Sequence, residues 1–500
     1  MKTARYKQWW FQFTLVLILA VLLRVPFLNG SFWLDEAAQA IESARPWWQQ
    51  FVLAEDFQPP FFHLVVHALQ YVSHAEWWLR LASVVPGIGS IAFVMLLLRK
   101  QVSQKAAVVT GSLLAVSNLH LFFSQELRPY MWGVFFAALS WYSVYEWLQA
   151  AEGKKRQRWL IFLTLSNALG FLSSYVFIFW WMAQWAMTVT FYPRKWWRVT
   201  QSFLVSSVFF MVWLPGFWEQ WRVGQTLRAS LPGWAEVVSV PFLKAVPLTL
   251  AKFVTGVLEV DISLWFVVSV GLWWVLLGVG VLAALASLQK KPGLSRNFLL
   301  QTLFLTSIAF GAAWLFTLLT PVLAPKRVLY LLPLILALVG VVVQYRRWVG
   351  LALVSWFVAW QAWANWSYWT QPVLQRENWR ALVQEVEHSF SAQNTAVVFG
   401  FDGPFASWRW YATEGWQTYN TGTVPPASYA EVEETLMGVQ NYEYVLVFDY
   451  LRDLTDPDRK IEFVLSEWGY EEIGAITYPN IGPVRMWVRQ QLFAENSQYE

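Results

Sequence analysis

The sequence predicts an α-helical protein that crosses a membrane many times and carries a small α/β domain at its C-terminus. Of its 500 residues, 57% are hydrophobic and 14% are charged, whereas soluble proteins have about 25% charged residues. Long apolar runs alternate with short loops, several of which are rich in lysine and arginine. This alternation stops after Thr370. We therefore expect a transmembrane domain over residues 1–370 and a second domain over residues 371–500.

Apolar runs define the expected transmembrane helices, because about 20 apolar residues cross the hydrocarbon core. Runs of nearly this length are Trp9–Leu28, Leu79–Leu98, Ala106–Phe123, Met131–Leu148, Trp159–Ser173, Tyr175–Tyr192, Phe203–Trp218, Ser263–Leu288, Phe298–Leu319, Val328–Val343 and Trp348–Trp366. The first resembles a signal peptide without a cleavage site, so we expect it to be retained. The prediction is about eleven transmembrane helices.

The distribution of positive charge predicts the orientation. If the N-terminus lies in the cytoplasm, the alternation places nearly all dense basic clusters there, as the positive-inside rule requires. These clusters are Lys2, Arg5 and Lys7; Arg99, Lys100 and Lys105; Lys154, Lys155, Arg156 and Arg158; Arg194, Lys195 and Arg198; Lys290, Lys291 and Arg296; and Arg346 and Arg347. The exception, Lys326 and Arg327, falls outside. We expect a bacterial plasma-membrane protein.

Two segments between the apolar runs are expected on the outer surface. Phe61–Ser73 is too short for a span and carries His63 and His67, so it predicts an amphipathic helix in the interface. Ala229–Phe253 is rich in proline and predicts a long, partly helical loop that could act as a lid. Many of the 36 tryptophans lie near span ends and indicate interfacial anchoring.

The C-terminal residues have the pattern of a water-exposed α/β domain. Glu377–Phe390, Ala427–Val439 and Arg459–Trp468 predict helices, whereas Thr395–Phe401, Tyr444–Phe448 and Val484–Val488 predict strands. An odd number of spans places this domain outside the cell. The chain has no cysteine, which excludes a disulfide, a thiol nucleophile and a thiolate metal site, and it has no nucleic-acid signature.

Five acids between the first two apolar regions form the clearest candidate site. They are Asp35, Glu36, Glu42, Glu55 and Asp56. Asp35 and Glu36 could supply a general base for an acceptor hydroxyl and a partner that orients it. The alternative is two solvated loop acids, or a cap for a helix over Ala37–Ser43.

Two further outer segments carry charged residues. Asp56-Phe57-Gln58-Pro59-Pro60 leads into the surface helix, and the proline pair restricts Gln58 to an extended conformation. The loop 124–130 carries Glu126 and Arg128, and Arg80 lies at the outer start of the second span. An isolated ion pair is weak evidence for function. The prediction that these segments share one side of the membrane is more informative.

In these segments the sequence resembles the protein mannosyltransferase and aminoarabinose transferase group of GT-C membrane glycosyltransferases, also called glycosyltransferase family 39. The matching motifs are Trp33-Leu34-Asp35-Glu36-Ala37, Asp56-Phe57-Gln58-Pro59-Pro60, Leu79-Arg80-Leu81 and Ser124-Gln125-Glu126-Leu127-Arg128-Pro129-Tyr130. They cover roughly the first 200 residues in the family order. The outer domain matches weakly, through Glu377-Asn378-Trp379-Arg380.

The resemblance implies transfer of a sugar from a polyprenyl-phosphate carrier, such as undecaprenyl or dolichyl phosphate, to an acceptor on the outer face, with inversion at the anomeric carbon. It implies that Asp35 is the base, with Glu36 beside it. Asp56 would hold the acceptor or a divalent cation, and Glu126 would shape the same region. Many relatives have histidine where this chain has Gln58, and a neutral amide argues against a metal there.

The resemblance also gives a role to cations on the outer face. A phosphate leaving group gains negative charge as the glycosidic bond breaks, and fixed cations stabilise it. Arg327 is the preferred donor clamp, because a guanidinium binds phosphate bidentately. Lys326, Arg80 and Arg128 are further candidates; the alternative for Lys326 is contact with lipid phosphates.

Two other classes of protein are compatible with the pattern. A transporter or flippase for a lipid-linked substrate would place ionisable residues at mid-span, and here they gather at one face instead. A non-catalytic scaffold would leave the acids from Asp35 to Asp56 without a role. The acceptor of a transferase could be a protein, a lipid or a glycan.

Overall fold

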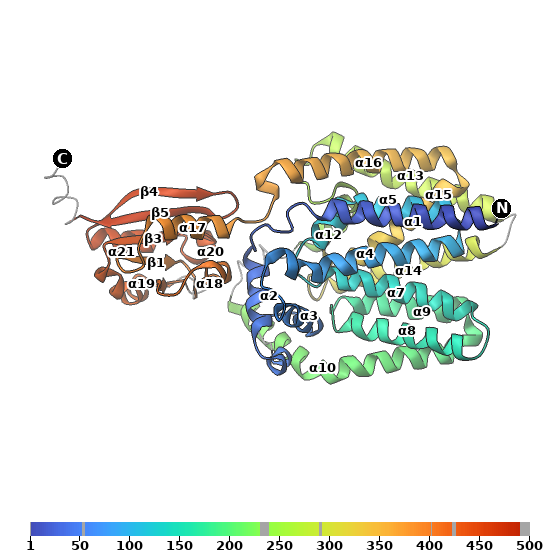
Figure 1. Ribbon diagram of the computed structural model, residues 1–500, viewed down its shortest axis with the longest axis horizontal. Helices are drawn as coiled ribbons and strands as arrows, with labels where there is room; N and C mark the ends of the chain where they lie inside the picture. Colours follow the sequence, from blue (N-terminus) through green and yellow to red (C-terminus); the bar gives the residue numbers. More distant parts are fainter. Residues whose placement is uncertain are drawn as a thin grey trace. The chain divides into compact units, whose positions relative to one another are not determined.

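The computed structural model describes residues 2–52, 56–230, 240–289, 293–401, 403–422 and 427–490. The chain divides into two compact units, and most of it is helical (Figure 1). The first unit contains Met1–Asn29, Pro46–Trp221 and Val240–Leu374. The second contains Gly30–Arg45, a stretch that begins at Arg222, and the residues from Gln375 onward. Residues 30–45 therefore group with the C-terminal residues, although they are far away in sequence.

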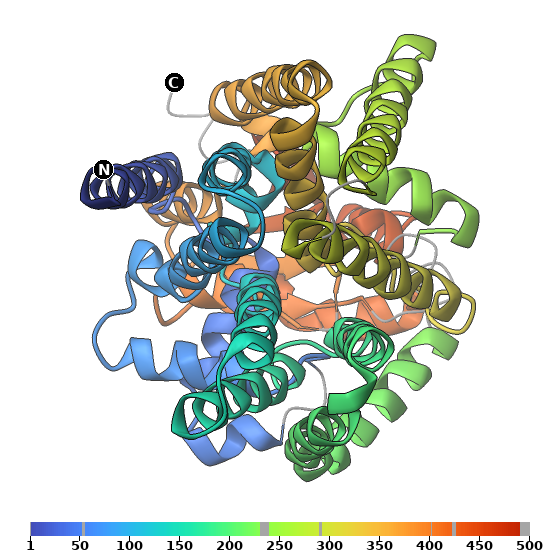
Figure 2. The same ribbon diagram turned by 90° about the vertical axis from the view of Figure 1, so that its right-hand side faces the viewer.

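The described part of the first unit is built from helices and short 3₁₀ turns (Figure 2). Its elements are α1 (Lys2–Arg24), η1 (Trp47–Phe51), α3 (Phe61–Gln70), α4 (Glu76–Gln101), α5 (Gln104–Val116), α6 (Asn118–Ser124), α7 (Tyr130–Gln149), α8 (Lys154–Phe171), α9 (Phe177–Phe191), η2 (Pro193–Lys195), α10 (Trp196–Ser230, whose last residues belong to the second unit), α12 (Phe242–Thr255), α13 (Leu264–Gln289), α14 (Leu294–Phe316), η3 (Leu329–Leu331), α15 (Leu332–Tyr345), α16 (Arg347–Thr370) and η4 (Pro372–Leu374).

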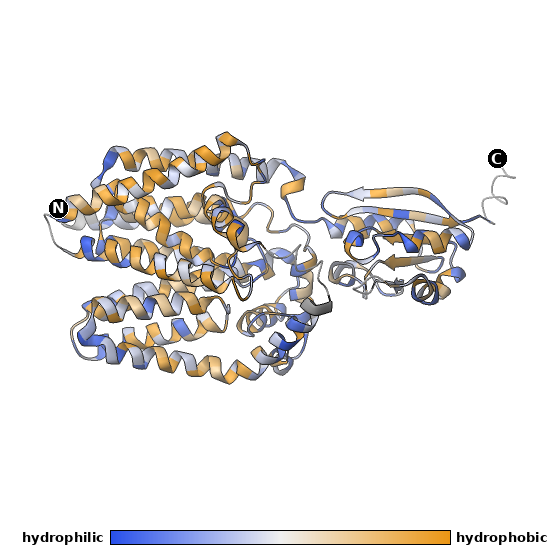
Figure 3. Cartoon of the chain, turned by 180° about the vertical axis from the view of Figure 1, so that it is seen from behind, coloured by the Kyte–Doolittle hydropathy of each residue, from blue (hydrophilic) through white to orange (hydrophobic). Residues whose placement is uncertain are grey.

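Each predicted span coincides with one of these helices or with a consecutive pair. Within the described residues, five helices are long and apolar enough to cross a membrane, and six if the bent pair α5 and α6 is one span. The hydropathy colouring of Figure 3 shows how apolar these helices are. The chain is an integral membrane protein, but the predicted number of eleven spans is not confirmed. The helix predicted from Phe61 is present as α3, and α12 makes the end of the predicted lid helical; residues 231–239 of that loop lie outside the described residues.

The predicted division of the segment 159–192 is also present. Helix α8 ends at Phe171 and α9 begins at Phe177, on either side of the expected break at Ser173 and Ser174. A second break, between α5 and α6, bends the chain by 61° and was not predicted. At this bend the backbone N–H of Asn118 donates to Gln361 Oε1 at 2.6 Å, and its amide donates to Asn365 Oδ1 at 3.0 Å. Polar side chains of α16 thus satisfy polar groups at the broken helix, as an apolar environment requires.

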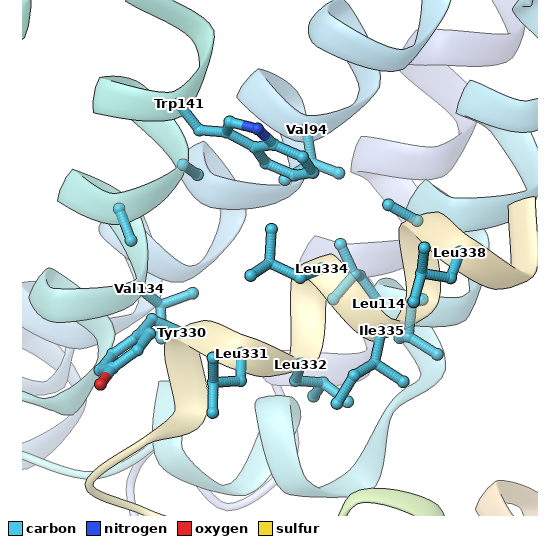
Figure 4. Packing of buried hydrophobic residues seen from close by; sticks show 14 of the residues in the cluster. Val94, Leu114, Val134, Trp141, Tyr330, Leu331, Leu332, Leu334, Ile335 and Leu338 are labelled. Atoms are coloured by element: carbon cyan, nitrogen blue, oxygen red, sulfur yellow. The ribbon is translucent and has the colours of Figure 1, made fainter. Parts of the chain in front are cut away.

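Helix α15 lies at the centre of the apolar core of the first unit. Its residues from Leu332 to Val343 are buried on every side, which explains why the segment is apolar all round rather than amphipathic. Figure 4 shows Leu334, Ile335 and Leu338 among side chains of neighbouring helices, including Val94 and Trp141. A Cβ added at Gly340 would overlap Thr110 and the carbonyl of Ala106, so this glycine permits close packing of α15 on α5.

A buried cation connects the C-terminal end of α1 to its neighbours. One Arg24 nitrogen lies 2.7 Å from His120 Nδ1, and another donates to the carbonyl of Ala20 at 2.8 Å. The other ring nitrogen of His120 lies 3.1 Å from Ser90 Oγ. These contacts give partners to both terminal nitrogens of Arg24 within the helical core, which is consistent with a structural role.

The described part of the second unit contains a five-stranded sheet in the order β2-β1-β3-β5-β4. Strands β2, β1 and β3 are parallel, whereas β5 is antiparallel to β3 and β4. The elements are α2 (Leu34–Ala44), α17 (Trp379–Ser389), β1 (Thr395–Phe399), α18 (Ala406–Tyr411), β2 (Gln417–Asn420), α19 (Tyr429–Leu436), η5 (Met437–Asn441), β3 (Tyr444–Phe448), α20 (Arg452–Thr455), α21 (Lys460–Glu467), β4 (Tyr470–Tyr478) and β5 (Gly482–Arg489).

The two faces of the sheet bury separate apolar clusters. Side chains of α17 and α18 pack with Val397 and Phe399 on one face, and those of α19 and α21 pack with Ala396 and Val398 on the other. All three predicted helices and all three predicted strands are confirmed, with shifted ends. Strands β2 and β4 were not predicted.

Candidate active site

Asp35 and Glu36 lie in the first turn of α2. The residue that caps this helix is Trp33, so the alternative in which Asp35 is the N-cap is wrong. An acid in the first turn is still favoured by the helix dipole. Glu36 is fully buried and Asp35 is half-buried, so the acids are not a pair of solvated loop residues.

This acid pair is surrounded by other residues of the second unit. They lie shortly after η4, with which the first unit ends. Arg376 Nε lies 3.8 Å from Glu36 Oε2, and both side chains are largely buried. The neighbouring Glu377 accepts hydrogen bonds from Tyr450 Oη at 2.8 Å and from Trp379 Nε1 at 2.6 Å. Burial raises the pKa of Glu377, and the negative charge of Asp35 acts in the same direction. The second unit thus gathers three carboxylates and a guanidinium at the start of α2.

A second polar cluster lies in the first unit and is centred on Asp56. His63 Nε2 lies 3.0 Å from Asp56 Oδ2, and the histidine side chain is completely buried. Pro60 caps α3, as the sequence predicts, and this start of the helix brings His63 back to Asp56. Gln220 of α10 donates to the backbone carbonyls of Asp56 and Gln58, and Tyr175 in turn donates to Gln220. The loop is therefore fixed by helices remote in sequence.

The surroundings of Asp56 favour its ionised form. Burial alone would raise the pKa of Asp56, but the contact with His63, the charge of Arg128 and the amide of Gln58 together hold it below the ordinary value. A buried carboxylate balanced in this way can accept hydrogen bonds from a sugar or bind a cation. The sequence had given His63 no role beside Asp56.

The chain therefore places an imidazole beside Asp56 even though Gln58 occupies the position of the family histidine. Asp56 and His63 offer two ligands for a metal. Among the described residues there is no group of three or more histidine, cysteine, aspartate or glutamate side chains arranged to hold a metal ion. A divalent cation would need a further ligand from a substrate or from solvent.

The loop between α6 and α7 contributes Glu126 and Arg128. Glu126 is buried, and its carbonyl accepts the backbone N–H of Arg128 at 2.7 Å. Ser83 of α4 donates to the carbonyl of Arg128 at 3.0 Å. Lys326 Nζ lies 5.7 Å from the ring centroid of Tyr130, at the end of this loop. The first unit thus brings together the segments 56–63, 124–130 and the residues around Lys326.

The remaining predicted cations differ in their environment. Arg80 is buried and donates to the carbonyl of Leu28 at 2.7 Å, which favours a structural role at the end of α1 over phosphate binding. Arg327 is only partly buried, and one of its nitrogens donates to the carbonyl of Pro321. Lys326 and Arg327 therefore fit the donor-binding prediction better than Arg80 does.

The geometry and the apolar helices define an integral membrane protein with clustered acids and cations at the ends of its helices. Residues 57–218 match the family model described as dolichyl-phosphate-mannose-protein mannosyltransferase. No curated protein sequence matches the chain significantly.

Two solved proteins share the fold over nearly the whole chain. ArnT from Cupriavidus metallidurans is 12% identical in the apo state, with a TM-score of 0.58 and coverage of 95% of this chain and 97% of that one. The same protein bound to undecaprenyl phosphate is 13% identical, with a TM-score of 0.58. The archaeal oligosaccharyltransferase AglB from Archaeoglobus fulgidus, in complex with an inhibitory peptide and a dolichol-phosphate, is 12% identical with a TM-score of 0.50, and the match covers 96% of this chain and 74% of AglB.

These matches confirm the expected resemblance. The chain has the fold of the GT-C membrane glycosyltransferases, and residues 57–218 are similar in sequence to the protein mannosyltransferases.

Proposed function

We propose that this protein is an inverting glycosyltransferase that moves a sugar from a polyprenyl-phosphate carrier to an acceptor hydroxyl at the outer face of the membrane. The similar ArnT structure contains undecaprenyl phosphate, and AglB contains a dolichol-phosphate. Both carriers are long polyprenyl chains that end in phosphate. A lipid of this kind fits a chain whose charged clusters are built at the ends of apolar helices.

The observation that carries the proposal is the arrangement of the segments within residues 57–218. This range matches the mannosyltransferase model, and it contains Gln58, His63 and Arg128, which act on the carboxylate of Asp56. A scaffold protein has no need of a carboxylate whose pKa is held low by an imidazole and a guanidinium. A site that binds a polar substrate does need such a carboxylate.

The proposed chemistry assigns each group a step. Asp35 accepts the proton of the acceptor hydroxyl, with Glu36 beside it, as the hydroxyl oxygen attacks the anomeric carbon. The attack comes from the face opposite the phosphate, so the bond to the phosphate oxygen breaks as the new glycosidic bond forms and the configuration inverts. The electron pair of the broken bond leaves with polyprenyl phosphate.

The cations serve the leaving group and Asp56 serves the sugar or the acceptor. Lys326, Arg327 and Arg128 stabilise the negative charge that grows on the phosphate. Asp56, held by His63, accepts hydrogen bonds from hydroxyl groups, and Glu126 shapes the same pocket. Placement on the outer face follows from the distribution of basic loops, with the N-terminus in the cytoplasm.

The experiment uses purified full-length protein in detergent with undecaprenyl- and dolichyl-phosphate sugars, each offered with protein, lipid and glycan acceptors. We expect acceptor-dependent release of polyprenyl phosphate with at least one combination, and no release by the Asp35→Asn variant. Asp453→Asn is the matched control, because Asp453 is a highly exposed aspartate of α20. Full activity of Asp35→Asn would remove Asp35 as the base.

The same assay separates the transferase from a flippase. A flippase moves its lipid-linked substrate intact, so it changes the leaflet of a polyprenyl-phosphate sugar in proteoliposomes without cleaving it. Movement without release of polyprenyl phosphate, for every donor and acceptor tested, would contradict the proposal.

A further inference from the structure

We propose that the C-terminal domain is a positioning element of the active site, and that Arg376 and Glu377 hold the start of α2 so that Asp35 and Glu36 face the acceptor. The catalytic meaning of this contact rests on the proposed transferase function. The contact itself is a structural statement about one compact unit, which contains both Gly30–Arg45 and the residues from Gln375 onward.

The backbone before α2 is attached to two helices of the C-terminal domain. Ser31 Oγ accepts a hydrogen bond from the backbone N–H of Arg380 in α17, at 3.0 Å. The backbone N–H of Phe32 donates to Tyr411 Oη in α18 at 2.7 Å. The Phe32 ring is buried, with its centroid 5.7 Å from that of Trp410. Segment 31–32 is therefore fixed by polar and apolar contacts together.

Glu377 brings a carboxylate from a distant part of the chain to the start of α2. The first N–H groups of a helix lack partners within the helix, and Trp33 at the N-cap makes no side-chain cap hydrogen bond. The backbone of Leu34, at the first position of α2, acts to lower the pKa of the Glu377 carboxylate, so this carboxylate lies close to the start of the helix. Tyr450 and Trp379 donate to the same carboxylate and fix its orientation.

Arg376 completes the arrangement at Glu36, two residues further along the helix. Its Nε lies 3.8 Å from Glu36 Oε2, and both groups are largely removed from solvent. Loss of one partner of a buried pair leaves the other charge uncompensated. Glu36 would then move toward water and turn α2, and Asp35 with it.

The position of Arg376 and Glu377 in the chain explains how the C-terminal domain can orient both acids of α2. Arg376 and Glu377 follow directly after η4, where the last helix of the first unit ends. Asn480, at the turn between β4 and β5, donates to the carbonyl of Gln375 at 2.9 Å. The junction that connects the domain to the membrane helices is thus the same segment that holds the acids.

Steady-state kinetics of the full-length protein test the proposal with the donor and acceptor that wild type uses. We expect Arg376→Gln and Glu377→Gln to lower kcat by about 10- to 100-fold, as expected when a reacting group is displaced by about 1 Å. The KM for the donor should change much less, because these residues are not assigned to the phosphate. Arg376→Lys should recover part of kcat, since it retains the charge.

Arg409→Gln is the matched control, because Arg409 is exposed on α18 of the same domain. It should retain wild-type kcat and KM. Wild-type kinetics in both Arg376→Gln and Glu377→Gln would overturn the proposal, as would an equal loss in the Arg409 variant.

A disulfide tests the contact without any activity measurement. The chain has no cysteine, and the 3.0 Å contact between Ser31 Oγ and the Arg380 nitrogen brings the two backbones within reach of a disulfide. We expect the Ser31→Cys/Arg380→Cys double variant to form an intramolecular disulfide on oxidation, visible as a mobility shift that reductant reverses. Neither single variant should show the shift.

The two experiments separate failure of this inference from failure of the proposed function. If wild type transfers sugar from no donor but the disulfide forms, the transferase proposal fails while the contact stands. If wild type is active and the double variant does not cross-link, the positioning inference is wrong. If the disulfide forms and the oxidised enzyme retains transfer, the docked state is the active one.

Discussion

The two charged clusters are built in opposite ways. In the first unit, Asp56 is held by side chains of a tightly packed helical frame, including His63 in the next helix and Gln220 in α10. In the second unit, Asp35 and Glu36 lie on a short helix whose support comes from residues far along the chain, at Arg376 and Glu377. Although Asp35 and Asp56 are close in sequence, each belongs to a different compact unit.

The difference teaches that separation in sequence is a poor guide to which residues support one another in this protein. The cluster around Asp56 depends on helices of the first unit. The acids of α2 depend on residues of the C-terminal domain, which would give that domain an influence on the proposed chemistry at Asp35.

The largest effect is expected at Asp35. Because it is the proposed base, Asp35→Asn should lower kcat by about 10²- to 10⁴-fold, the usual contribution of a general base. Thermal unfolding of the variant in detergent should resemble that of wild type. A loss of equal size in Asp453→Asn would show that the effect is not specific to the site.

A smaller effect is expected in the Asp56 cluster, whose groups bind rather than react. Asp56→Asn and His63→Gln should each lower kcat/KM by about tenfold, which corresponds to about 1.4 kcal/mol. The double variant should lose little more than either single variant, because the two side chains are in contact. Additive losses in this kinetic double-mutant cycle would show that Asp56 and His63 act independently.

A comparable effect on donor affinity is expected at Lys326. Lys326→Gln should raise the KM for the polyprenyl-phosphate sugar by about tenfold and leave kcat nearly unchanged, because a cation is lost from the proposed phosphate site. Lys155→Gln removes an exposed lysine from the first turn of α8 and should leave KM unchanged. If both variants raise KM equally, the effect reflects general attraction to anionic lipids.

The smallest effect is a difference in how pH changes the stability of the two clusters. The pKa of Asp56 lies below 3.8 in the folded protein, so its stabilisation is complete above pH 3.8 and is lost as pH falls through the lowered pKa. The pKa of Glu377 lies above 4.5, so its stabilisation is complete below pH 4.5 and is lost as pH rises through the raised pKa.

Thermal unfolding of Asp56→Asn and Glu377→Gln across this pH range measures the contrast. Relative to wild type, Asp56→Asn should lose less stability on acidification, and Glu377→Gln should gain less. If the difference in stability between variant and wild type changes with pH in the same direction for both variants, the two acids do not differ in environment as described.

Much of the helical framework could be predicted because membrane helices must be long and apolar. The division near Ser173 was predictable because it preserves the alternation of the later basic clusters. The bend between α5 and α6 was not, since Ser117 and Asn118 interrupt the apolar run only briefly. The helices and buried strands of the C-terminal domain were predictable from periodicity. Strand β4 was missed because its residues, such as Glu471 and Glu472, are mostly exposed and lack a continuous apolar pattern.

The candidate site likewise contains residues that the sequence predicts and contacts that it does not. The acids Asp35, Glu36 and Asp56 stood out because charge is costly between apolar segments. The contact of His63 with Asp56 depends on how the proline pair starts α3, which the sequence alone does not reveal. The approach of Glu377 to the start of α2 joins residues remote in the chain, and the motif Glu377–Arg380 indicated only a weak family resemblance.

The most direct test of the account compares polyprenyl phosphate released with acceptor glycosylated, in wild type and in Asp35→Asn side by side. The account predicts one molecule of polyprenyl phosphate for each glycosylated acceptor in wild type, and neither product above background in the variant. Equal rates in the two proteins, or consumption of the donor without any glycosylated acceptor, would contradict it.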